Sequence, residues 1–297
     1  MQKIVVLLLF SISLSAQMMN YDIKPSSLKS SKFMGISILD VKELKFENSD
    51  VKELSALAYD NKILYALGDK GFLYHFDMKI KNQEIKKLKL QKVFKLKNKN
   101  KKRLKKSQRD SEGIALVGDD ILISFEKKPR VTRFSTKGVK IKDMKINKAL
   151  RDIKNYKGAN KALEALAYSE KYGIITAAEL PLKGRDENLH TLYAQKKEWQ
   201  FQKQGSVTSL EFMSKNSLMI LQRKFNNFTR QRVITISQLN LKTNKYKILA
   251  KFDTRDGWNI DNFEGLTKVS KNKYLMISDD NGSFLQKTLL VLFEVNE

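Results

Sequence analysis

Residues 111–126 read SEGIALVGDDILISFE: a glutamate heads one strand-like run, a polar turn follows, and a second strand-like run ends in another acid. The first half of this unit returns about every fifty residues. The returning glutamates are Glu53 in ELSALAYD, Glu112 in SEGIALVG, Glu164 in LEALAYSE, Glu211 in LEFMSKN and Glu264 in FEGLTKVS. A period of this length, built from short strands, is typical of a propeller or a solenoid.

The second run of each unit ends in a charged residue. This residue is an acid in four units, and the last acid is doubled: Asp69, Glu126, Glu179, and Asp279 with Asp280. In the fourth unit the run reads LMILQR, and Arg223 takes the place of the acid.

The units hold about four candidate strands each, but the last has only three before the chain stops. We therefore predict an all-β fold, a β-propeller of five blades. A sixth, degenerate blade would have to lie in residues 140–165 or 225–262. An N-terminal strand from residues 33–46 is available to complete the last blade, which closes the ring and hides its edges.

The N-terminus reads MQKIVVLLLFSISLSAQ, with a positive residue, an apolar stretch and small residues suited to cleavage. The apolar stretch is too short to cross a bilayer core of roughly 30 Å. We expect a signal peptide over residues 1–16, a leader over 17–32 and one propeller domain over 33–297; the alternatives are an uncleaved N-terminal anchor or a buried strand. The absence of cysteine excludes disulfides and thiol chemistry. We predict a periplasmic or secreted monomer without a transmembrane segment in the mature chain.

The formal net charge is +25, which suggests a nucleic-acid or membrane partner. Lysine is, however, spread through nearly every turn, and only residues 95–109, KLKNKNKKRLKKSQR, form a dense basic run. This run is either a solvated loop between blades or a flexible arm for an anionic surface. It lacks the interleaved aromatic residues that bind single-stranded nucleic acids, so we predict no nucleic-acid partner.

In a propeller, residues at the same point of each repeat lie on one ring around the axis. The five repeated glutamates would form such a ring, with the acids of the second runs beside it. So many carboxylates need cations, raised pKa values or hydrogen bonds that hold them apart. Oxygen donors without cysteine, in a chain with two histidines, favour Ca²⁺ over zinc or copper. Alternatively, each glutamate ties its blade to backbone N–H groups of the next. Arg130, Arg185 and Arg223 are candidate counter-charges or ligands of an anionic substrate.

The elements DSEGIAL, SFE, LEALAYS, NFEGL and SDDNGS, in this order, resemble the phytase-like family of exported bacterial propellers, labelled esterase-like activity of phytase. The resemblance covers residues 33–297. It implies a calcium-dependent carboxylate face and a phosphoester hydrolase activity. The residues that it places on this face are Glu112, Glu126, Glu164, Glu179, Glu264, Asp279 and Arg223.

Two functions follow from these observations. The first is hydrolysis of a small anionic phosphate ester, with Glu126 or Glu179 as base and Arg223 holding the phosphate. The predicted metal ligands are Glu53, Glu112, Glu164, Glu264, Asp279 and Asp280. The second is a non-catalytic propeller that binds a ligand or partner, with a structural acidic ring. A serine esterase is disfavoured, because no GxSxG motif occurs and the strand context of His75 and His190 is ordinary.

Overall fold

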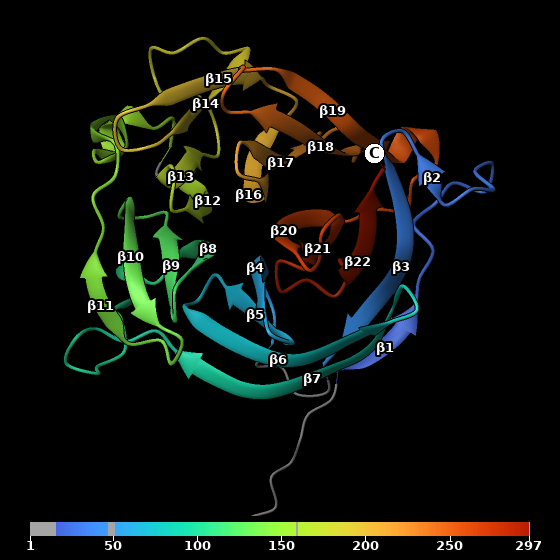
Figure 1. Cartoon of the computed structure of the whole chain (residues 1–297), viewed down its shortest axis with the longest axis horizontal. Helices are drawn as coiled ribbons and strands as arrows, with labels where there is room; N and C mark the ends of the chain where they lie inside the picture. Colours follow the sequence, from blue (N-terminus) through green and yellow to red (C-terminus); the bar gives the residue numbers. More distant parts are fainter. Residues whose placement is uncertain (1–15, 47–50, 159, 297) are drawn as a thin grey trace, which may run out of the picture.

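The computed structural model describes residues 16–46, 51–158 and 160–296. Five antiparallel sheets stand radially around one axis, so the described chain forms a five-bladed β-propeller, which confirms the predicted fold (Figure 1). Blade 1 consists of β4 (Leu54–Asp60), β5 (Ile63–Gly68), β6 (Phe72–Lys81) and β7 (Glu84–Lys95). Blade 2 consists of β8 (Ser111–Val117), β9 (Asp120–Phe125), β10 (Arg130–Ser135) and β11 (Lys140–Asp143). Blade 3 consists of β12 (Leu163–Ser169), β13 (Gly173–Ala178), β14 (Leu189–Tyr193) and β15 (Glu198–Gln202).

Blade 4 consists of β16 (Ser206–Ser214), β17 (Ser217–Phe225), β18 (Arg232–Asn240) and β19 (Tyr246–Asp253). Blade 5 consists of β20 (Asn262–Lys268), β21 (Lys273–Asp279) and β22 (Thr288–Val295), to which the N-terminal strands β3 (Ile36–Lys45), β1 (Gln17–Asn20) and β2 (Lys32–Phe33) are added. Residues 225–262 thus complete blade 4, and the stretch 140–165 supplies β11, a connection and the start of β12, so neither range makes a sixth blade.

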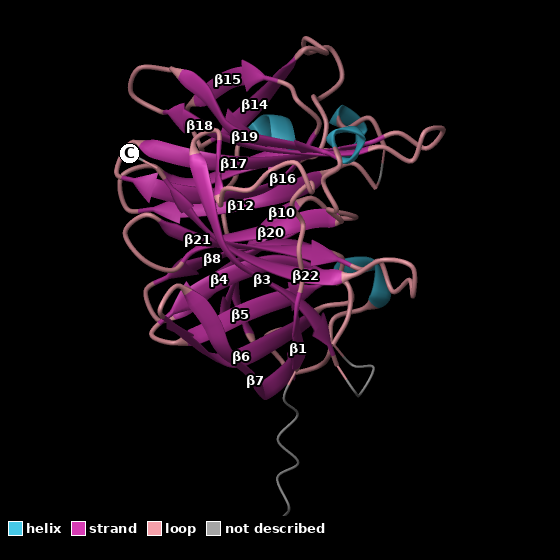
Figure 2. Cartoon of the chain, turned by 90° about the vertical axis from the view of Figure 1, so that its right-hand side faces the viewer, coloured by secondary structure: helices cyan, strands magenta, loops and turns pink. Residues whose placement is uncertain are grey.

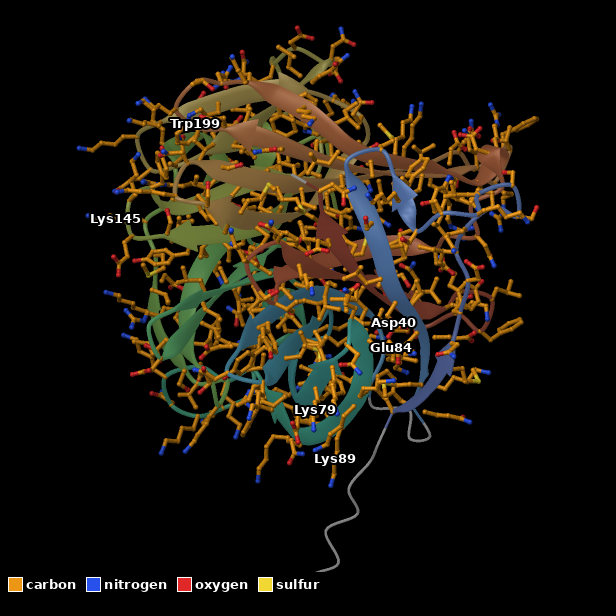
Figure 3. The ribbon with its side chains drawn as sticks, turned by 45° about the vertical axis from the view of Figure 1, so that its right-hand side comes forward. Asp40, Lys79, Glu84, Lys89, Lys145 and Trp199 are labelled. Atoms are coloured by element: carbon orange, nitrogen blue, oxygen red, sulfur yellow. The ribbon has the colours of Figure 1, made fainter. Side chains whose placement is uncertain are left out.

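The ring is closed by the N-terminal strand, as predicted. β3 pairs with β22 along its length, with Val41 opposite Val291. β1, which comes from the expected leader, then pairs with β3 on the outside. A second contact joins this strand to blade 1, because the Asp40 carboxylate accepts a hydrogen bond of 2.7 Å from the backbone N–H of Ile85 in β7. Figure 3 shows Asp40 and Glu84 side by side at this seam. β3 thus covers the outer edge of β22, which would otherwise be unpaired.

Apolar side chains fill the spaces between the blades. The described residues form five buried clusters, one at each interface between neighbouring blades. The cluster between blades 4 and 5, for example, contains Ile236, Phe252 and Phe263, all fully buried. Alternation along an inner strand sends its apolar side chains to both neighbouring interfaces: in β5, Leu64 and Ala66 belong to the cluster with blade 5, and Tyr65 and Leu67 to the cluster with blade 2. Lysines such as Lys79 and Lys145 lie exposed on the rim (Figure 3).

The basic run is a folded connection between β7 and β8. Leu96 and Leu104 within it are buried against the interface of blades 1 and 2, and the Arg103 guanidinium lies 5.1 Å from the ring of Phe72. This matches the predicted loop between blades rather than a flexible arm. The short 3₁₀ helices η1 (Lys106–Gln108), η2 (Lys148–Leu150), η3 (Ile153–Asn155) and η4 (Thr254–Asp256) lie in connections of this kind.

The two ends of the central channel differ. The connections that lead into the innermost strands β8, β12 and β20 carry the 3₁₀ helices, and Figure 2 shows these helices on one side of the disc with the C-terminus on the other. The innermost strands therefore begin on the helix side. No helix in the described ranges is both long and apolar enough to span a bilayer. The expected signal peptide lies almost wholly in residues 1–15, outside the described residues.

Candidate functional site

The acidic mouth is the end of the channel where the innermost strands begin. Each of these strands has a β-bulge or a similar irregularity near its start, where one residue (in β8 and β12, two residues) is skipped in the pairing with the second strand. A bulge turns a side chain away from the regular alternation. The bulged residues that occupy equivalent positions around the axis are Ser55, Glu112, Glu164, Thr208 and Glu264.

Two of the five predicted ring glutamates are therefore wrongly placed. Glu53 precedes β4 and lies outside the bulge, and its carboxylate pairs with Lys70 at 2.5 Å. Glu211 lies three positions beyond Thr208, in the pairing region of β16 nearer the opposite end of the channel. Both units contain a glutamate near their start. Strand pairing, however, places the hydroxyl residues Ser55 and Thr208 at the ring positions.

The residue after each bulged position is small in every blade: Ala56, Gly113, Ala165, Ser209 and Gly265. A Cβ atom on Gly113 would lie 2.6 Å from the carbonyl oxygen of Glu164 in blade 3. A Cβ on Gly265 would lie 2.7 Å from the side chain of Ile277. The blades approach most closely near the axis, so the EG and EA pairs of the repeat are packing requirements of the propeller.

The acids of the second runs form an outer tier, as predicted. Asp69, Glu126 and Glu179 directly follow their strands, and the backbone N–H of Glu179 still bonds the carbonyl of Ala162 at 2.9 Å. Arg223 and Asp279 occupy the equivalent positions in blades 4 and 5, where they pair with Ser206 and Asn262.

Arg223 neutralises the blade 4–5 side of the acidic mouth. Its Nη1 lies 2.9 Å from Oε1 of Glu264, and its Nη2 lies 3.9 Å from Oε1 of Glu179. Asn262 bonds both partners, since it accepts from Arg223 and donates to Glu264 at 2.8 Å. The Lys161 ammonium lies 2.9 Å from Glu179. Glu179 and Glu264 are therefore compensated by fixed positive charge.

Glu112 and Glu164 are buried without such compensation. Their exposed fractions are 9% and 7%, and neither carboxylate accepts a hydrogen bond from any residue that the structure describes. Burial raises the pKa of Glu112 well above its usual range, and the nearby Glu164, Asp69 and Glu126 raise it further. The pKa of Glu164 is likewise raised, by burial first and then by Glu179 and Glu264.

The outer tier shows the same shortage of positive charge. Burial, followed by the charges of Asp279 and Glu264, raises the pKa of Asp69 to about 9. Burial raises the pKa of Asp279 to about 8 and that of Glu126 to about 7. Oδ1 of Asp69 is buried and has no hydrogen-bond partner among the described residues. Protons or a bound cation must therefore compensate this part of the mouth.

Three carboxylates in blade 2 can hold a metal ion. One oxygen from each of Asp110, Glu112 and Glu126 lies within 4.8 Å of the other two, a cluster that we call the carboxylate trio. Oxygen donors of this kind suit Ca²⁺, and the buried, unpaired Glu112 carboxylate supports the fit. Asp110 is a site residue that the sequence prediction missed, although it opens the DSEG motif. Its proximity to Glu126 follows from pairing, because the N–H of Glu126 bonds the Asp110 carbonyl at 3.1 Å.

The structure does not bring Asp280 into the metal cluster. Its Oδ1 accepts hydrogen bonds from the backbone N–H groups of Glu53 at 3.2 Å and Gly282 at 2.9 Å, and its Oδ2 accepts one from the Thr288 hydroxyl at 3.1 Å. Asp280 thus joins blade 5 to blade 1. Asp279 and Asp280 are consecutive, but only Asp279 belongs to the outer tier.

Two of the predicted substrate-binding arginines lie away from the axis. Arg130 stacks on the ring of Phe125 at 3.8 Å and donates to two backbone carbonyls. Arg185 pairs at 3.0 Å with Glu198 on the outermost strand of blade 3. Among the three arginines predicted, only Arg223 lies in the acidic mouth.

Hydroxyl groups make several of the ties that the alternative hypothesis assigned to glutamates. Ser55 donates to the carbonyl of Ser111 at 3.1 Å, and Ser124 donates to that of Glu164 at 2.7 Å. Carboxylates among the described residues also make such ties to a backbone N–H of the next blade: Glu126 to Ala162 at 3.3 Å, Asp280 to Glu53 at 3.2 Å and, at the other end of the channel, Glu211 to Lys268 at 3.2 Å. His190 is a buried strand residue whose Nε2 contacts the carbonyl of Gly205 at 2.6 Å.

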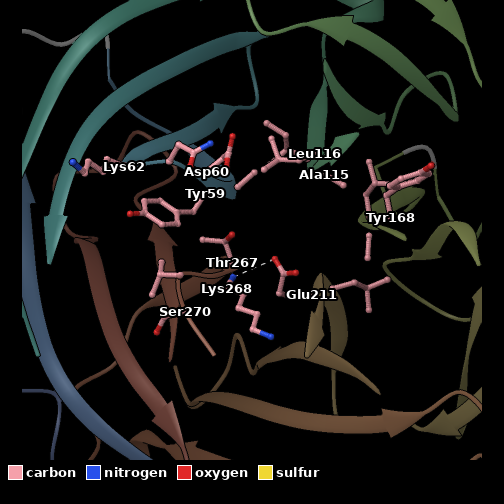
Figure 4. A pocket seen from close by; sticks show the side chains of 17 residues that line it. Tyr59, Asp60, Lys62, Ala115, Leu116, Tyr168, Glu211, Thr267, Lys268 and Ser270 are labelled. Carbon is pink, nitrogen blue, oxygen red and sulfur yellow. Dashed lines mark hydrogen bonds between the residues drawn. The ribbon is translucent and has the colours of Figure 1, made fainter. Parts of the chain in front are cut away.

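The opposite end of the channel holds a cavity of about 870 Å³ (Figure 4). Glu211 lies here, and its carboxylate accepts a hydrogen bond of 3.2 Å from the N–H of Lys268. Burial raises its pKa to about 7. Figure 4 shows Tyr59, Tyr168 and Lys62 around the same cavity, where the described residues form no cluster of three carboxylates like that of the acidic mouth.

Comparisons with known proteins agree with this architecture. Glutaminyl cyclase of Myxococcus xanthus aligns with a TM-score of 0.50 and 10% identity, over 88% of this chain and 97% of that one. The U3-55K structure aligns with a TM-score of 0.43 and 8% identity, over 83% of this chain; the alignment spans 62% of the U3-55K chain. At 10% identity the likeness to glutaminyl cyclase concerns the fold alone.

No curated protein matches the sequence. Residues 49–282 match the phytase-like family, described as esterase-like activity of phytase. This range contains all five innermost strands, the bulged glutamates, the outer tier and the carboxylate trio. The chain belongs to the phytase-like family.

Proposed function

We propose that this protein hydrolyses an anionic phosphate ester at the acidic mouth, with a divalent cation, preferably Ca²⁺, bound by the carboxylate trio. Membership of the phytase-like family supports a hydrolase. The observation that carries the proposal is the convergence of Asp110, Glu112 and Glu126 within 4.8 Å. These three converging carboxylate oxygens would supply part of the six to eight oxygen ligands that Ca²⁺ takes, and water would supply others.

The charge balance of the acidic mouth favours a bound cation. Eight carboxylates lie here, namely Asp69, Asp110, Glu112, Glu126, Glu164, Glu179, Glu264 and Asp279. The described residues supply three paired cations, which are Arg223, Lys161 and Lys127, the last 2.9 Å from Asp110. A divalent ion would neutralise part of the excess without protonating the acids.

A divalent cation in this place would supply positive charge beside an ester oxygen and increase the acidity of bound water. Glu126 then belongs to the ligand set rather than acting as the predicted base. Glu179 is paired with Lys161 and Arg223, so it serves as a counter-charge. Glu164 stands in the blade between the trio and Arg223, and burial raises its pKa well above the usual range, which favours the protonated carboxyl group. We assign to Glu164 the donation of this proton to the leaving oxygen.

Two sources of positive charge, the Arg223 guanidinium and the net charge of the whole protein, favour an anionic substrate. Arg223 is the only arginine among the described residues that pairs with any of the eight carboxylates of the acidic mouth, and it lies beside two of them that it must also compensate. The formal net charge of +25 would increase the rate of encounter with an anion at low ionic strength. We retain export to the periplasm or medium as part of the proposal, on the N-terminal sequence alone.

The alternative is a non-catalytic propeller that binds a ligand or partner. The paired state of Glu179 and Glu264 favours it, because a purely structural ring would have its acids compensated in this way. Glu112 and Glu164, which have no such partner among the described residues, favour the hydrolase.

The experiment measures thermal unfolding and p-nitrophenyl phosphate turnover of one set of samples, with EDTA and with Ca²⁺. At a calcium concentration of about 100 Kd we expect a stabilisation of about 2.7 kcal/mol, which is a rise in Tm of roughly 5 °C, together with turnover. Glu112→Gln should lose both effects. Glu211→Gln is the matched control, since it removes a partly buried glutamate from an innermost strand away from the acidic mouth.

The outcomes separate the two functions. A calcium-dependent shift without turnover would support the binding propeller with a structural ion. Turnover that persists in EDTA and in Glu112→Gln would contradict the assigned metal site. Absence of both shift and turnover would refute the proposed function.

A further inference from the structure

A second cavity opens at the acidic mouth between blades 4 and 5. Its volume is about 270 Å³, just below the range of about 300–1,000 Å³ that is usual for small-molecule sites. It lies between the β17–β18 hairpin and the loop after β21. We call it the blade 4–5 cleft and define it by Arg223, Phe225, Arg230, Arg232, Asn281 and Leu285.

The cleft is strongly basic, although it adjoins a mouth rich in carboxylates. Arg223, Lys224, Arg230 and Arg232 line it, against one acid, Asp261. The Asp261 carboxylate is already occupied, since it accepts hydrogen bonds from the backbone N–H groups of Asn262 and Lys287, at 2.9 and 2.8 Å, and from Gln286 at 3.3 Å. Arg232 lies 3.6 Å from it. Arg230 forms no ion pair with any described residue, so its charge is available to an anion.

The cleft also has an apolar wall. Phe225 is 43% exposed, and the guanidinium groups of Arg232 and Arg230 lie 5.2 and 5.7 Å from its ring. Leu285 on the facing loop is 75% exposed. Of the eight large apolar side chains that are exposed in the described parts of the chain, these two and their neighbours Phe228 and Phe284 make up four. This gathering in two facing loops is more than the scattered apolar residues of an ordinary surface.

We propose that the blade 4–5 cleft binds an anionic group that is joined to an apolar aryl or acyl group. Arg230 and Arg223 hold the anion, and Phe225 and Leu285 cover the apolar part. If the proposed function holds, on which this assignment of a substrate class rests, the preferred substrate is an amphiphilic phosphate ester rather than a fully polar one. The small volume admits one such group, and Arg223 connects the cleft to Glu264 of the acidic mouth.

The test compares three probes by titration calorimetry with the purified protein, in EDTA and again in Ca²⁺. 1-Naphthyl phosphate carries both groups, glycerol 2-phosphate carries only the anion, and 1-naphthol carries only the apolar group. We expect 1-naphthyl phosphate to bind at least about tenfold more tightly than either of the others, because it uses both the guanidinium groups and the apolar wall.

Two variants locate the binding and one controls for loss of a similar stack elsewhere. Arg230→Gln and Leu285→Ser should each weaken the binding of 1-naphthyl phosphate about tenfold. Both residues are exposed, so their replacement should leave Tm unchanged. Arg103→Gln is the control, because Arg103 is an exposed arginine that lies over Phe72 in blade 1, outside the cleft; it should bind as the unaltered protein does.

The results distinguish the cleft from the proposed function. Equal affinity for 1-naphthyl phosphate and glycerol 2-phosphate, or unchanged affinity in both cleft variants, would overturn the cleft assignment even if phosphate esters are hydrolysed. Selective binding that is lost in the cleft variants would support the cleft, whether or not turnover is observed. Turnover of p-nitrophenyl phosphate in the same samples reports separately on the acidic mouth.

Discussion

Replacing Arg223 by methionine should destabilise the protein strongly at alkaline pH and much less at acid pH. At an effective dielectric of 20, the attraction of the guanidinium is about 6 kcal/mol for the Glu264 oxygen at 2.9 Å and about 4 kcal/mol for the Glu179 oxygen at 3.9 Å. The cost of burying the arginine offsets several kcal/mol of this attraction. We therefore expect a net loss of about 3–5 kcal/mol in the free energy of unfolding at pH 8.

The pH dependence follows from the carboxylates that the substitution leaves behind. Burial raises the pKa of Glu264, and Arg223 is the main influence that lowers it. Without Arg223 the folded state binds protons that the unfolded state has released, so the stability of the variant falls as pH rises above the ordinary glutamate pKa of about 4.3. At pH 5 the carboxyl groups of the variant take up protons, and the loss should shrink to about half.

The measurement is urea unfolding in EDTA at pH 5 and pH 8, followed by the fluorescence of Trp199 and Trp258, which are the only tryptophans and are both buried. Arg133→Met is the control, because Arg133 pairs with Asp120 at 2.7 Å on a partly exposed strand and should cost at most about 1 kcal/mol. A loss below about 1 kcal/mol for the Arg223 variant at pH 8, or equal losses at both pH values, would refute the reasoning.

Three further results are expected. In EDTA the stability of the unaltered protein should fall as pH rises from about 5 to 9. The reason is that Asp69 and Asp279, with pKa values of about 9 and about 8, hold protons in the folded state that the unfolded state releases. A Tm that rises over this pH range would contradict this prediction. Gly113→Val should cost about 1–3 kcal/mol in urea unfolding through its clash with blade 3, whereas Gly158→Ala, whose Cβ would have ordinary contacts at 3.5 Å, should be nearly neutral. Removal of residues 17–45 should leave the outer edge of β22 unpaired, so the protein should elute as aggregates in size-exclusion chromatography. A soluble product that unfolds cooperatively would show that blade 5 does not need β3.

The sequence predicts the fold well because the blade is a local pattern. Each unit joins consecutive strands by short turns, so the alternation of apolar residues and the turn residues identify them without long-range information. The turn at Asn61 and Lys62, both with positive φ, is of the kind that such hairpins use. Even the ring closure is predictable, since the last unit lacks one strand and residues 33–46 have no other partner.

The site is less predictable because it depends on register. The sequence shows a glutamate near the start of each unit, but it cannot show which residue enters the bulge. Glu53 and Glu211 therefore look equivalent to Glu112, whereas pairing places Ser55 and Thr208 on the ring. The outer tier is simpler, because each of its members comes at the end of a regular strand and needs no bulge to be located.

Asp110 and Lys161 show a second limit of the sequence. Each precedes an innermost strand and acts on the acid of an outer-tier strand, Glu126 and Glu179 respectively. Nothing in the residue pattern of a connection states which carboxylate it will meet. The only signal is the crowding of charged residues just before each repeated unit, as in RDSEG.

The pairing of β3 with β22 sets the order in which this molecule can be completed. The Ser37 side chain bonds the side chain of Asn296, 259 residues further along the chain, so a strand made near the beginning waits for one made at the end. Until then Ile36, Ile38 and Val41, all buried in the finished ring, have no sheet to cover them. Contacts between residues so far apart in the sequence slow folding, and they prolong the time during which unpaired strand edges and apolar surface can aggregate. The β3–β22 pairing that closes the ring therefore leaves the growing chain in need of protection from aggregation until β22 has been made.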